Sequence, residues 1–447
     1  MQLPKSSFIR PGRRRAITAL AITATAALAL TGCSGGSVTG NTGGGGGGKT
    51  DITVWYNYTG PNVTSAKKLI DKFNSSQDKY TVTPQYAANS DQFDAKLINA
   101  LKNGTGPNMV LGDSTPQNIG QVVQTGKVLP LDSLLSDSSS SITKDTFTEG
   151  MLSTGSFNGK QYTLPTDVGD YAVVYNKQMF KEAGITDTPT TWTEFAADAK
   201  KLTKGTTQYG AYLPIGTGEW PVFTWQAMLW SAGGEFLNED NTKVEFNSPE
   251  GVAALTAWTD MIKDGSAYPQ SLQTASDNNG TPGMTAKKVA MQINGAYNLS
   301  VLDEGLGDGN VGVFPLPALK EPAMNLGTNN SYLIKGTKAQ EAGSWAFLQY
   351  WLKPSTQAVW DSENGFLPSN KATADNATWT AYLDKNPRIA TFAKELDYAK
   401  ARPSITQYAE VSDALSQELQ KAMLLKESPS DALAAAEKGA QAALDKQ

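Results

Sequence analysis

Histidine is absent from the 447 residues of this chain, and cysteine occurs once, at Cys33. Without histidine the chain cannot form a Ser-His-Asp or Cys-His catalytic unit or a histidine-ligated metal site. With a single cysteine it cannot form an intramolecular disulfide. We therefore expect no bound metal and no cofactor, and we expect any enzymatic chemistry to depend on carboxylates.

Charged residues and long apolar runs are also scarce. Charged residues make up 18% of the chain, and the apolar run from Ala16 to Leu30 is shorter than the ~20 residues a membrane-spanning helix needs. Because basic residues precede this run, it has the form of a signal peptide. Cleavage after residue 32 would remove five basic residues and no acidic one, which takes the formal net charge from -5 to -10. Such an acidic protein is poorly suited to nucleic acid or anionic membranes.

The apolar run ends in Leu-Thr-Gly-Cys33, which resembles the bacterial lipobox, where the cysteine becomes the lipid-modified first residue. We predict a lipoprotein signal peptide over residues 1–32 and a lipid anchor on Cys33. An ordinary secretory signal with an incidental cysteine is the alternative, and Arg14-Arg15 would permit twin-arginine export. Residues 33–50 are rich in Gly, Ser and Thr and predict a flexible tether. The expected location is the outer face of the bacterial cytoplasmic membrane, with the lipid anchor as the sole membrane contact.

The chain is too long for one hydrophobic core, so we expect two lobes. From Ile52 onward, strand patterns alternate with helix patterns, which predicts parallel, doubly wound sheets. A buried strand is expected over residues 170–175, and Thr191 with Glu194 predicts a capping box for the helix that follows. In such sheets ligands lie beyond the carboxyl ends of the strands.

Several motifs occur in one order along the chain: GPNMVLGDS at 106–114, LPTDV at 164–168, YNK at 175–177, FKEAGI at 180–185, PTTWTEF at 189–195 and KVAMQINGAY at 288–297. Together they resemble the extracellular solute-binding proteins of carbohydrate ABC importers (family 1), which include maltose- and glycerol-3-phosphate-binding proteins. The resemblance runs from about Ile52 to the C-terminus. Asn108, Lys287 and Tyr297 depart from the acid, glycine and tryptophan that are usual in the family.

The resemblance implies an α/β fold of two doubly wound lobes joined by a multi-strand hinge, the type II class of periplasmic-binding-protein-like folds. Lobe 1 would comprise residues 51–167 and 316–361, and lobe 2 residues 168–315 and 362–447. The implied function is a non-catalytic receptor that closes around a mono- or short oligosaccharide. The expected partners are this small-molecule carbohydrate and the transmembrane subunits of an ABC importer. We expect a monomer with no nucleic-acid partner.

A sugar presents hydroxyl groups and apolar C–H faces, which carboxylates, amides and aromatic rings can match. The candidate ligand-binding residues, at strand ends and turns, are Tyr56, Asn57, Tyr58, Asp113, Asp167, Asp170, Trp220, Trp225, Asn294, Tyr297, Gly327, Thr328, Asn329, Arg402 and Tyr408. Tyr297 is the strongest candidate because the family's stacking aromatic falls there. Core packing is an equal alternative for Tyr56, and helix capping is one for Asp113 and Asp170. Trp225 is placed in the pocket because its aromatic stretch lacks helical periodicity.

Other functions remain open. A secreted lipoprotein glycoside hydrolase would need only paired carboxylates, and a surface adhesin would lack a deep cleft between lobes. Within the receptor family, Arg402 would permit a glycerol phosphate as the ligand. Asp113, Asp167 and Asp170 would repel such a phosphate, so an unphosphorylated sugar is favoured.

Replacing Cys33 by Ala should release the protein from the membrane into the medium, because the variant has no thiol to carry the lipid. Immunoblots of membrane and culture-supernatant fractions measure this, with Ser37→Ala as the control that keeps the thiol. Retention of the Cys33→Ala variant in the membrane fraction would show that the anchor assignment is wrong.

Overall fold

The structure is a computed structural model that describes residues 48–88, 90–114 and 116–446. The predicted signal peptide (1–32), the predicted lipidation site Cys33 and nearly all of the predicted tether (33–50) lie outside the described residues. The chain from Gly48 onward forms one compact unit. Within the described ranges, none of the helices has the length and apolar character that a membrane crossing requires.

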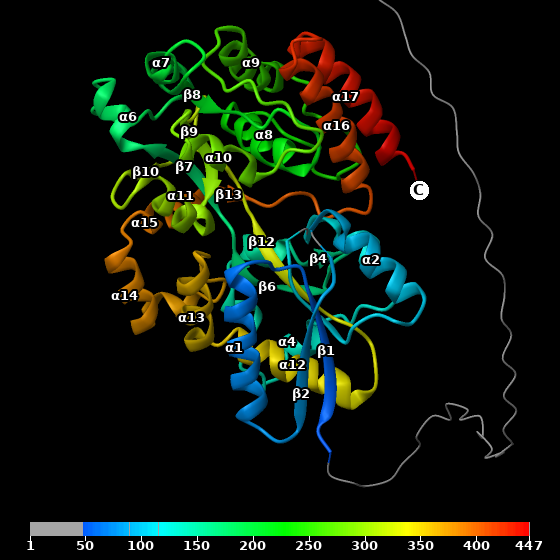
Figure 1. Ribbon diagram of the computed structural model, residues 1–447. Coiled ribbons are helices and arrows are strands. Elements are labelled where there is room, and N and C mark those ends of the chain that lie inside the picture. Colours follow the sequence, from blue (N-terminus) through cyan, green and yellow to red (C-terminus); the bar gives the residue numbers. More distant parts are fainter. Residues whose placement is uncertain (1–47, 89, 115, 447) are drawn as a thin grey trace, which may run out of the picture. The chain divides into compact units, whose positions relative to one another are not determined.

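A five-stranded sheet combines N-terminal strands with one from late in the chain (Figure 1). Its order is β2-β1-β3-β12-β6, with β1 (Thr50–Tyr56), β2 (Tyr80–Tyr86), β3 (Met109–Asp113), β12 (Thr328–Leu333) and β6 (Thr163–Val168). β1 is parallel to β2 and β3, and β12 is antiparallel to β3 and β6. Helices α1 (Pro61–Ser75) and α2 (Ser90–Lys102) lie between the parallel strands in the chain, as crossovers must. The carboxyl ends of β1 and β3 therefore meet at one edge of the sheet.

Strand β12 begins within residues 325–330, a polar segment whose composition is typical of a loop. Its polar side chains are buried but have partners: the Asn330 amide donates to Thr163 Oγ1 at 2.8 Å and to Thr154 Oγ1 at 3.2 Å. A buried polar group that is hydrogen-bonded avoids most of the cost of leaving water. The strand can therefore contain residues whose polarity suggested a loop.

A four-stranded sheet has the order β10-β7-β9-β8, with β10 (Val311–Phe314), β7 (Tyr171–Asn176), β9 (Val289–Gly295) and β8 (Tyr209–Tyr212). β7 is antiparallel to β10 and β9, and β8 is parallel to β9. The chain first passes from the five-stranded sheet to this sheet at Gly169 and Asp170, between β6 and β7. Two short strand pairs complete the pairing: β4 (Ser156–Phe157) with β5 (Lys160–Gln161), and β11 (Met324–Asn325) with β13 (Ala399–Lys400).

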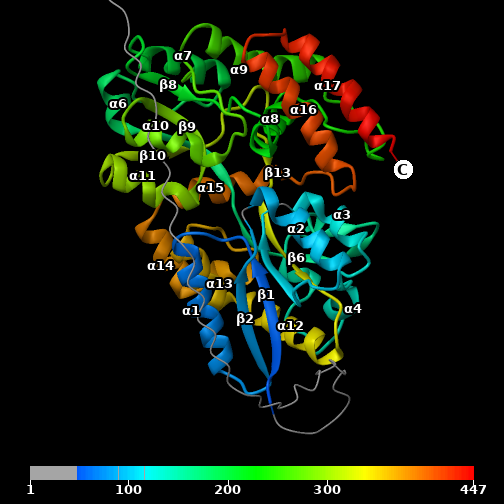
Figure 2. The same ribbon diagram turned by 45° about the vertical axis from the view of Figure 1, so that its right-hand side comes forward.

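The other helices cover these sheets (Figures 1 and 2). They are α3 (Ile119–Val123), α4 (Asp132–Leu135), α5 (Glu149–Ser153), α6 (Lys177–Glu182), α7 (Trp192–Leu202), α8 (Glu219–Ser231), α9 (Pro249–Lys263), α10 (Thr281–Thr285), α11 (Leu299–Leu306), α12 (Lys338–Trp351), α13 (Pro354–Asn364), α14 (Ala377–Lys385), α15 (Ile389–Glu395), α16 (Tyr408–Met423) and α17 (Pro429–Leu444). α12 packs against β1, α7 packs against β8, and α16 packs against α17, α8 and α9.

Helix α8 contains the aromatic stretch around Trp225 that lacks helical periodicity in the sequence. Every side chain from Pro221 to Ser231 in it is buried. A helix enclosed on all sides needs no polar face, so its sequence shows no amphipathic period. This explains why the stretch from Trp220 to Trp225 lacks a helical pattern in the sequence.

The predicted capping box of α7 is confirmed. The backbone N–H of Glu194 donates to Thr191 Oγ1 at 3.2 Å, and the backbone N–H of Thr191 donates to Glu194 Oε2 at 3.1 Å. Both bonds satisfy donors that a helix N-terminus leaves without partners. They fix the start of a helix whose Trp192 and Phe195 enter the core.

Thr191→Ala should lower the free energy of unfolding by about 1 kcal/mol, the usual cost of losing an N-cap hydroxyl. Urea denaturation measures this. Thr193, exposed in the first turn of the same helix, provides the control, and Thr193→Ala should leave stability unchanged or slightly raised. Equal effects of the two substitutions would contradict the capping role.

Candidate ligand-binding site

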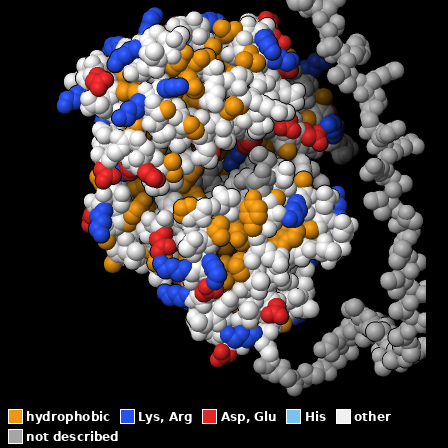
Figure 3. All heavy atoms as spheres, viewed as in Figure 1, with side chains coloured by type: hydrophobic (Ala, Val, Ile, Leu, Met, Phe, Trp, Pro, Cys, Tyr) orange, Lys and Arg blue, Asp and Glu red, His pale blue; other side chains and the backbone are white. Residues whose placement is uncertain are grey.

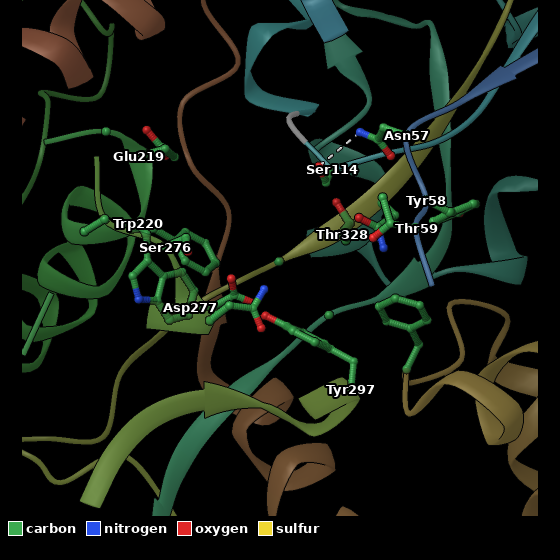
Figure 4. A pocket seen from close by; sticks show the side chains of 18 of the residues that line it. Asn57, Tyr58, Thr59, Ser114, Glu219, Trp220, Ser276, Asp277, Tyr297 and Thr328 are labelled. Atoms are coloured by element: carbon green, nitrogen blue, oxygen red, sulfur yellow. Dashed lines mark hydrogen bonds between the residues drawn. The ribbon is translucent and has the colours of Figure 1, made fainter. Parts of the chain in front are cut away.

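A cavity of about 390 Å³ lies where the ends of β1 and β3 face the start of α8 (Figure 4). It is lined by Asn57, Tyr58, Thr59, Asn62, Ser114, Gly169, Gly218, Glu219, Trp220, Phe223, Thr274, Ala275, Ser276, Asp277, Asn278, Tyr297, Gly327, Thr328, Asn329, Phe366 and Arg402. Thr328 and Asn329 lie in β12, Glu219, Trp220 and Phe223 lie in α8, and the others lie in segments that follow or connect helices and strands. The volume is within the ~300–1,000 Å³ of small-molecule sites.

Part of the predicted site lines this cavity: Asn57, Tyr58, Trp220, Tyr297, Gly327, Thr328, Asn329 and Arg402. Asn57 directly follows β1, and its amide donates to Ser114 Oγ, just after β3, at 3.3 Å. In Figure 4 these two residues lie on one side and Trp220 on the other. The structure thus brings together strand ends that the sequence suggested separately.

Aromatic side chains form much of the cavity wall. The Trp220 ring centroid lies 5.8 Å from that of Phe223, and the Tyr297 centroid lies 5.8 Å from that of Phe366. The Tyr297 ring packs so closely on the backbone that a Cβ on Gly295 would come within 2.0 Å of it, so glycine is required there. Planar rings held in this way present apolar faces of fixed orientation.

The hydroxyl of Tyr297 is anchored by Asp277, toward which it points in Figure 4. Burial, followed by the charge of Asp277, raises the pKa of Tyr297 well above its usual value. Tyr297 therefore stays protonated and can donate to the carboxylate. Burial also raises the pKa of Asp277.

Arg402 and Glu219 form an ion pair at the cavity wall. Arg402 Nη1 lies 2.7 Å from Glu219 Oε1, and the Arg402 guanidinium carbon lies 4.4 Å from the Phe223 ring centroid. Tyr408 Oη donates to Glu219 Oε1 at 2.9 Å, and the Ser412 hydroxyl donates to Glu219 Oε2. Among the described lining residues Arg402 is the cation, and its charge is compensated within the protein.

Asp167 lies behind the cavity and orients a residue that lines it. Its carboxyl group is fully buried and accepts hydrogen bonds from the Asn329 amide and, at 2.9 Å, from Trp360 Nε1. Burial raises the pKa of Asp167 to about 7. The bond from Asn329 fixes the orientation of that amide at the cavity wall.

Other predicted site residues, Tyr56, Asn294 and Tyr408, lie outside the cavity lining. The Tyr56 ring stacks on Tyr58 with centroids 6.1 Å apart. Asn294 Oδ1 accepts from Asn298 Nδ2 at 2.7 Å and from the backbone of Gly295. Tyr408 donates the hydrogen bond to the lining residue Glu219 that is described above.

The remaining predicted residues are enclosed. Asp113 accepts a hydrogen bond from Tyr332 Oη at 3.0 Å, and Asp170 accepts one from the backbone N–H of Tyr171 at 2.8 Å. The Trp225 side chain is fully buried in α8, where it meets Phe246 edge-on. A strand-end or aromatic position indicates nearness to the site, but it does not fix the side chain's direction.

Sequence reasoning missed several lining residues, among them Glu219, Phe223, Ser276, Asp277 and Phe366. Glu219 and Phe223 flank Trp220 in the aromatic stretch, which was a usable signal. Ser276 and Asp277 lie in a segment without strand or helix periodicity. Gly365-Phe366 has the sequence of a turn and carries no chemical indication of a site.

Comparisons with known proteins agree with the resemblance that the sequence motifs indicate. The sequence model of the family described as bacterial extracellular solute-binding protein matches residues 68–388. A Brucella abortus protein, provisionally named a binding protein, is 30% identical over 326 residues, which cover 72% of this chain and 77% of that protein. The sn-glycerol-3-phosphate-binding periplasmic protein UgpB of Yersinia pestis is 24% identical over 406 residues, which cover 86% and 90% of the two chains.

Among solved structures, the cyclic alpha-maltosyl-1,6-maltose binding protein from Arthrobacter globiformis superimposes with a TM-score of 0.76 at 27% identity. The match covers 90% of this chain and 100% of that one. The predicted α/β fold of two lobes, in the type II periplasmic-binding class, is confirmed.

The raised pKa of Asp167 makes stability depend on pH. An unfolded aspartate titrates near ~3.9, whereas Asp167 in the folded protein titrates at about 7. Between these values the folded state holds a proton that the unfolded state has lost, so stability falls as pH rises.

Asp167→Asn should therefore flatten the decline in unfolding free energy between pH 5 and pH 7, by up to about 1.4 kcal/mol per pH unit. Urea denaturation at several pH values measures the slope. The pKa of buried Glu395 is also raised to about 7, but Glu395 is present in both proteins and cancels. Asp240→Asn, at an exposed position, should leave the slope unchanged. An unaltered slope in the Asp167→Asn variant would contradict the assignment.

Proposed function

Because the chain belongs to the family of bacterial extracellular solute-binding proteins, we propose that it is a receptor that binds a neutral carbohydrate in the 390 Å³ cavity. The bound sugar passes to the transmembrane subunits of an ABC importer, and the receptor catalyses no reaction. The two lobes close about the segments that connect the two sheets, and this closure encloses the ligand. The boundaries 51–167 with 316–361 and 168–315 with 362–447 are our proposal for the lobes.

The observation that carries this proposal is the chemistry of the cavity wall. Trp220 and Tyr297 offer flat apolar faces, and Asn57, Thr328 and Asn329 offer amide and hydroxyl groups beside them. This combination matches a ring that is apolar on its faces and covered with hydroxyl groups at its edge. We propose these lining residues as the ligand contacts, with Asp167, Asn294 and Tyr408 as residues that position them.

The charges of the cavity favour an uncharged ligand. A phosphate would have to draw Arg402 away from Glu219, to which it is bonded at 2.7 Å, and would also meet the carboxyl group of Asp277. The charge-assisted bond lost in that exchange offsets the one gained. The name of the Yersinia pestis relative specifies sn-glycerol-3-phosphate, and that of the Arthrobacter globiformis protein specifies cyclic alpha-maltosyl-1,6-maltose. Because Arg402 is already paired with Glu219, we favour a neutral carbohydrate over a phosphate as the ligand of this chain.

The surface and the N-terminal sequence support an anchored receptor at the outer face of the cytoplasmic membrane. On the face drawn in Figure 3, Lys and Arg side chains are interspersed with Asp and Glu side chains. This mixture differs from the single-sign field that attracts nucleic acid. The lipobox-like segment ending at Cys33 supports a lipid anchor.

A thermal-shift screen over neutral mono- and oligosaccharides, with glycerol 3-phosphate as the charged comparison, tests the proposal. We expect a neutral sugar to raise the melting temperature and glycerol 3-phosphate to have little effect. Chromatography of the recovered sugar should show it intact. Stabilisation by glycerol 3-phosphate alone, or cleavage of an oligosaccharide, would overturn the proposal.

Trp220→Ala should weaken the binding of the sugar found in this screen about tenfold or more, equivalent to about 1.4 kcal/mol, because the ring face is lost. Isothermal titration calorimetry measures the dissociation constant. Tyr86 is 50% exposed and outside the cavity lining, so Tyr86→Ala is the control and should bind as the unmodified protein does. Unchanged affinity in the Trp220→Ala variant would exclude Trp220 as a contact.

A further inference from the structure

A second cavity, of about 520 Å³, adjoins the first. The two share the lining residues Thr59, Asn62, Asn278 and Tyr297. The second cavity extends from these residues between the start of α1, the start of α11, the end of α13 and the turn between α14 and α15. The two cavities therefore lie next to each other, with the Tyr297 ring where they meet.

The charged residues of the second cavity are already paired. Arg388 makes two hydrogen bonds of 2.7 Å to the two carboxylate oxygens of Asp303. Glu363 lies 2.5 Å from Lys68 Nζ and accepts from the Ser65 hydroxyl at 2.7 Å. Compensated charges attract neither an anion nor a cation strongly, so this cavity favours a neutral ligand, as the first one does.

The other groups of the second cavity suit the same ligand chemistry. Tyr382 contributes an aromatic ring, Asn298 and Asn386 contribute amides, and Val301 is an apolar side chain that is 49% exposed. An aromatic ring beside amides is also what lines the first cavity, and the exposed Val301 adds an apolar surface to the second. Rings and amides thus line the space on both sides of Tyr297, which belongs to both linings.

We propose, resting on the function proposed above, that the ligand is an oligosaccharide whose chain runs from the first cavity past Tyr297 into the second. One part of the chain lies between Trp220 and Tyr297, and the rest lies along Val301, Tyr382 and Asn386. The turn between α14 and α15 then contributes to the choice of ligand length. A monosaccharide in the first cavity leaves these contacts unmade.

Calorimetry with linear neutral gluco-oligosaccharides of one to six rings, α-1,4- and β-1,4-linked, tests this proposal on the full-length protein. We expect affinity to rise about tenfold or more between one ring and the longer chains of the preferred linkage. Val301→Trp places bulk in the second cavity from an exposed position, and Asn386→Ala removes an amide. Both should reduce this gain, while the affinity for the monosaccharide stays within about twofold. Leu425→Trp, at a residue 47% exposed and outside both linings, is the matched control.

The outcomes separate the two proposals. A monosaccharide that binds as tightly as every longer chain overturns the extended ligand and leaves the carbohydrate receptor intact. The extended ligand is overturned in the same way if the longer chains bind more tightly but Val301→Trp and Asn386→Ala leave that gain unchanged. Failure of every sugar, one ring or longer, to bind overturns the receptor function and the extended ligand together. Melting temperatures of the variants show whether each has folded.

Discussion

A carboxyl group removed from water must find its hydrogen bonds inside the protein, and Asp167 finds them in segments far away in the sequence. Asn329 of β12 and Trp360 of α13 both donate to it. A buried carboxylate without hydrogen-bond donors destabilises the fold far more than an exposed one, because water can supply donors to the exposed group. The bonds to Asp167 therefore keep β6, β12 and α13 in contact where the chain leaves the five-stranded sheet. The same bonds orient Asn329 at the cavity wall, so the constraint that stabilises the crossing also shapes the site.

A second constraint acts on the charges. Glu219 opens α8 and is bonded by Arg402, Tyr408 and Ser412, which follow it by more than 180 residues. This network attaches the start of α16 to the start of α8 and neutralises the cation at the cavity wall. The Arg388–Asp303 pair does the same in the adjoining cavity. Polar groups that are already fixed by hydrogen bonds lose little conformational entropy when a ligand binds. Because the charges are also paired, this arrangement favours a ligand recognised by its hydroxyl groups and ring faces over one recognised by its charge.

The parts of the fold that depend on local pattern could be predicted from the sequence. The strands near Ile52 and over residues 170–175, and the capping box at Thr191, follow from periodicity and from residues three positions apart. α8 could not be delimited because burial on all sides removes the amphipathic period. The start of β12 could not be predicted because the hydrogen-bond partners that allow Asn330 to be buried, Thr154 and Thr163, lie about 170 residues earlier in the chain. For the site, strand ends such as Asn57 were found, but the sequence could not distinguish a lining residue from one that supports it from behind, as Tyr408 does.

The motifs that identify the family are mostly structural in this chain. Asn176 of the YNK motif caps α6 by accepting from the backbone of Met179 at 3.1 Å, and Thr191 caps α7. The lining residues Asn57, Ser276, Asp277 and Arg402 lie outside the segment from Leu164 to Thr203, in loops and at the ends of elements. A loop residue can change without loss of the caps and sheet pairings that hold the fold. Family membership therefore follows from motifs that mostly build the lobes, whereas most residues that line the cavity lie outside those motifs, with Ser114 and Tyr297 as exceptions.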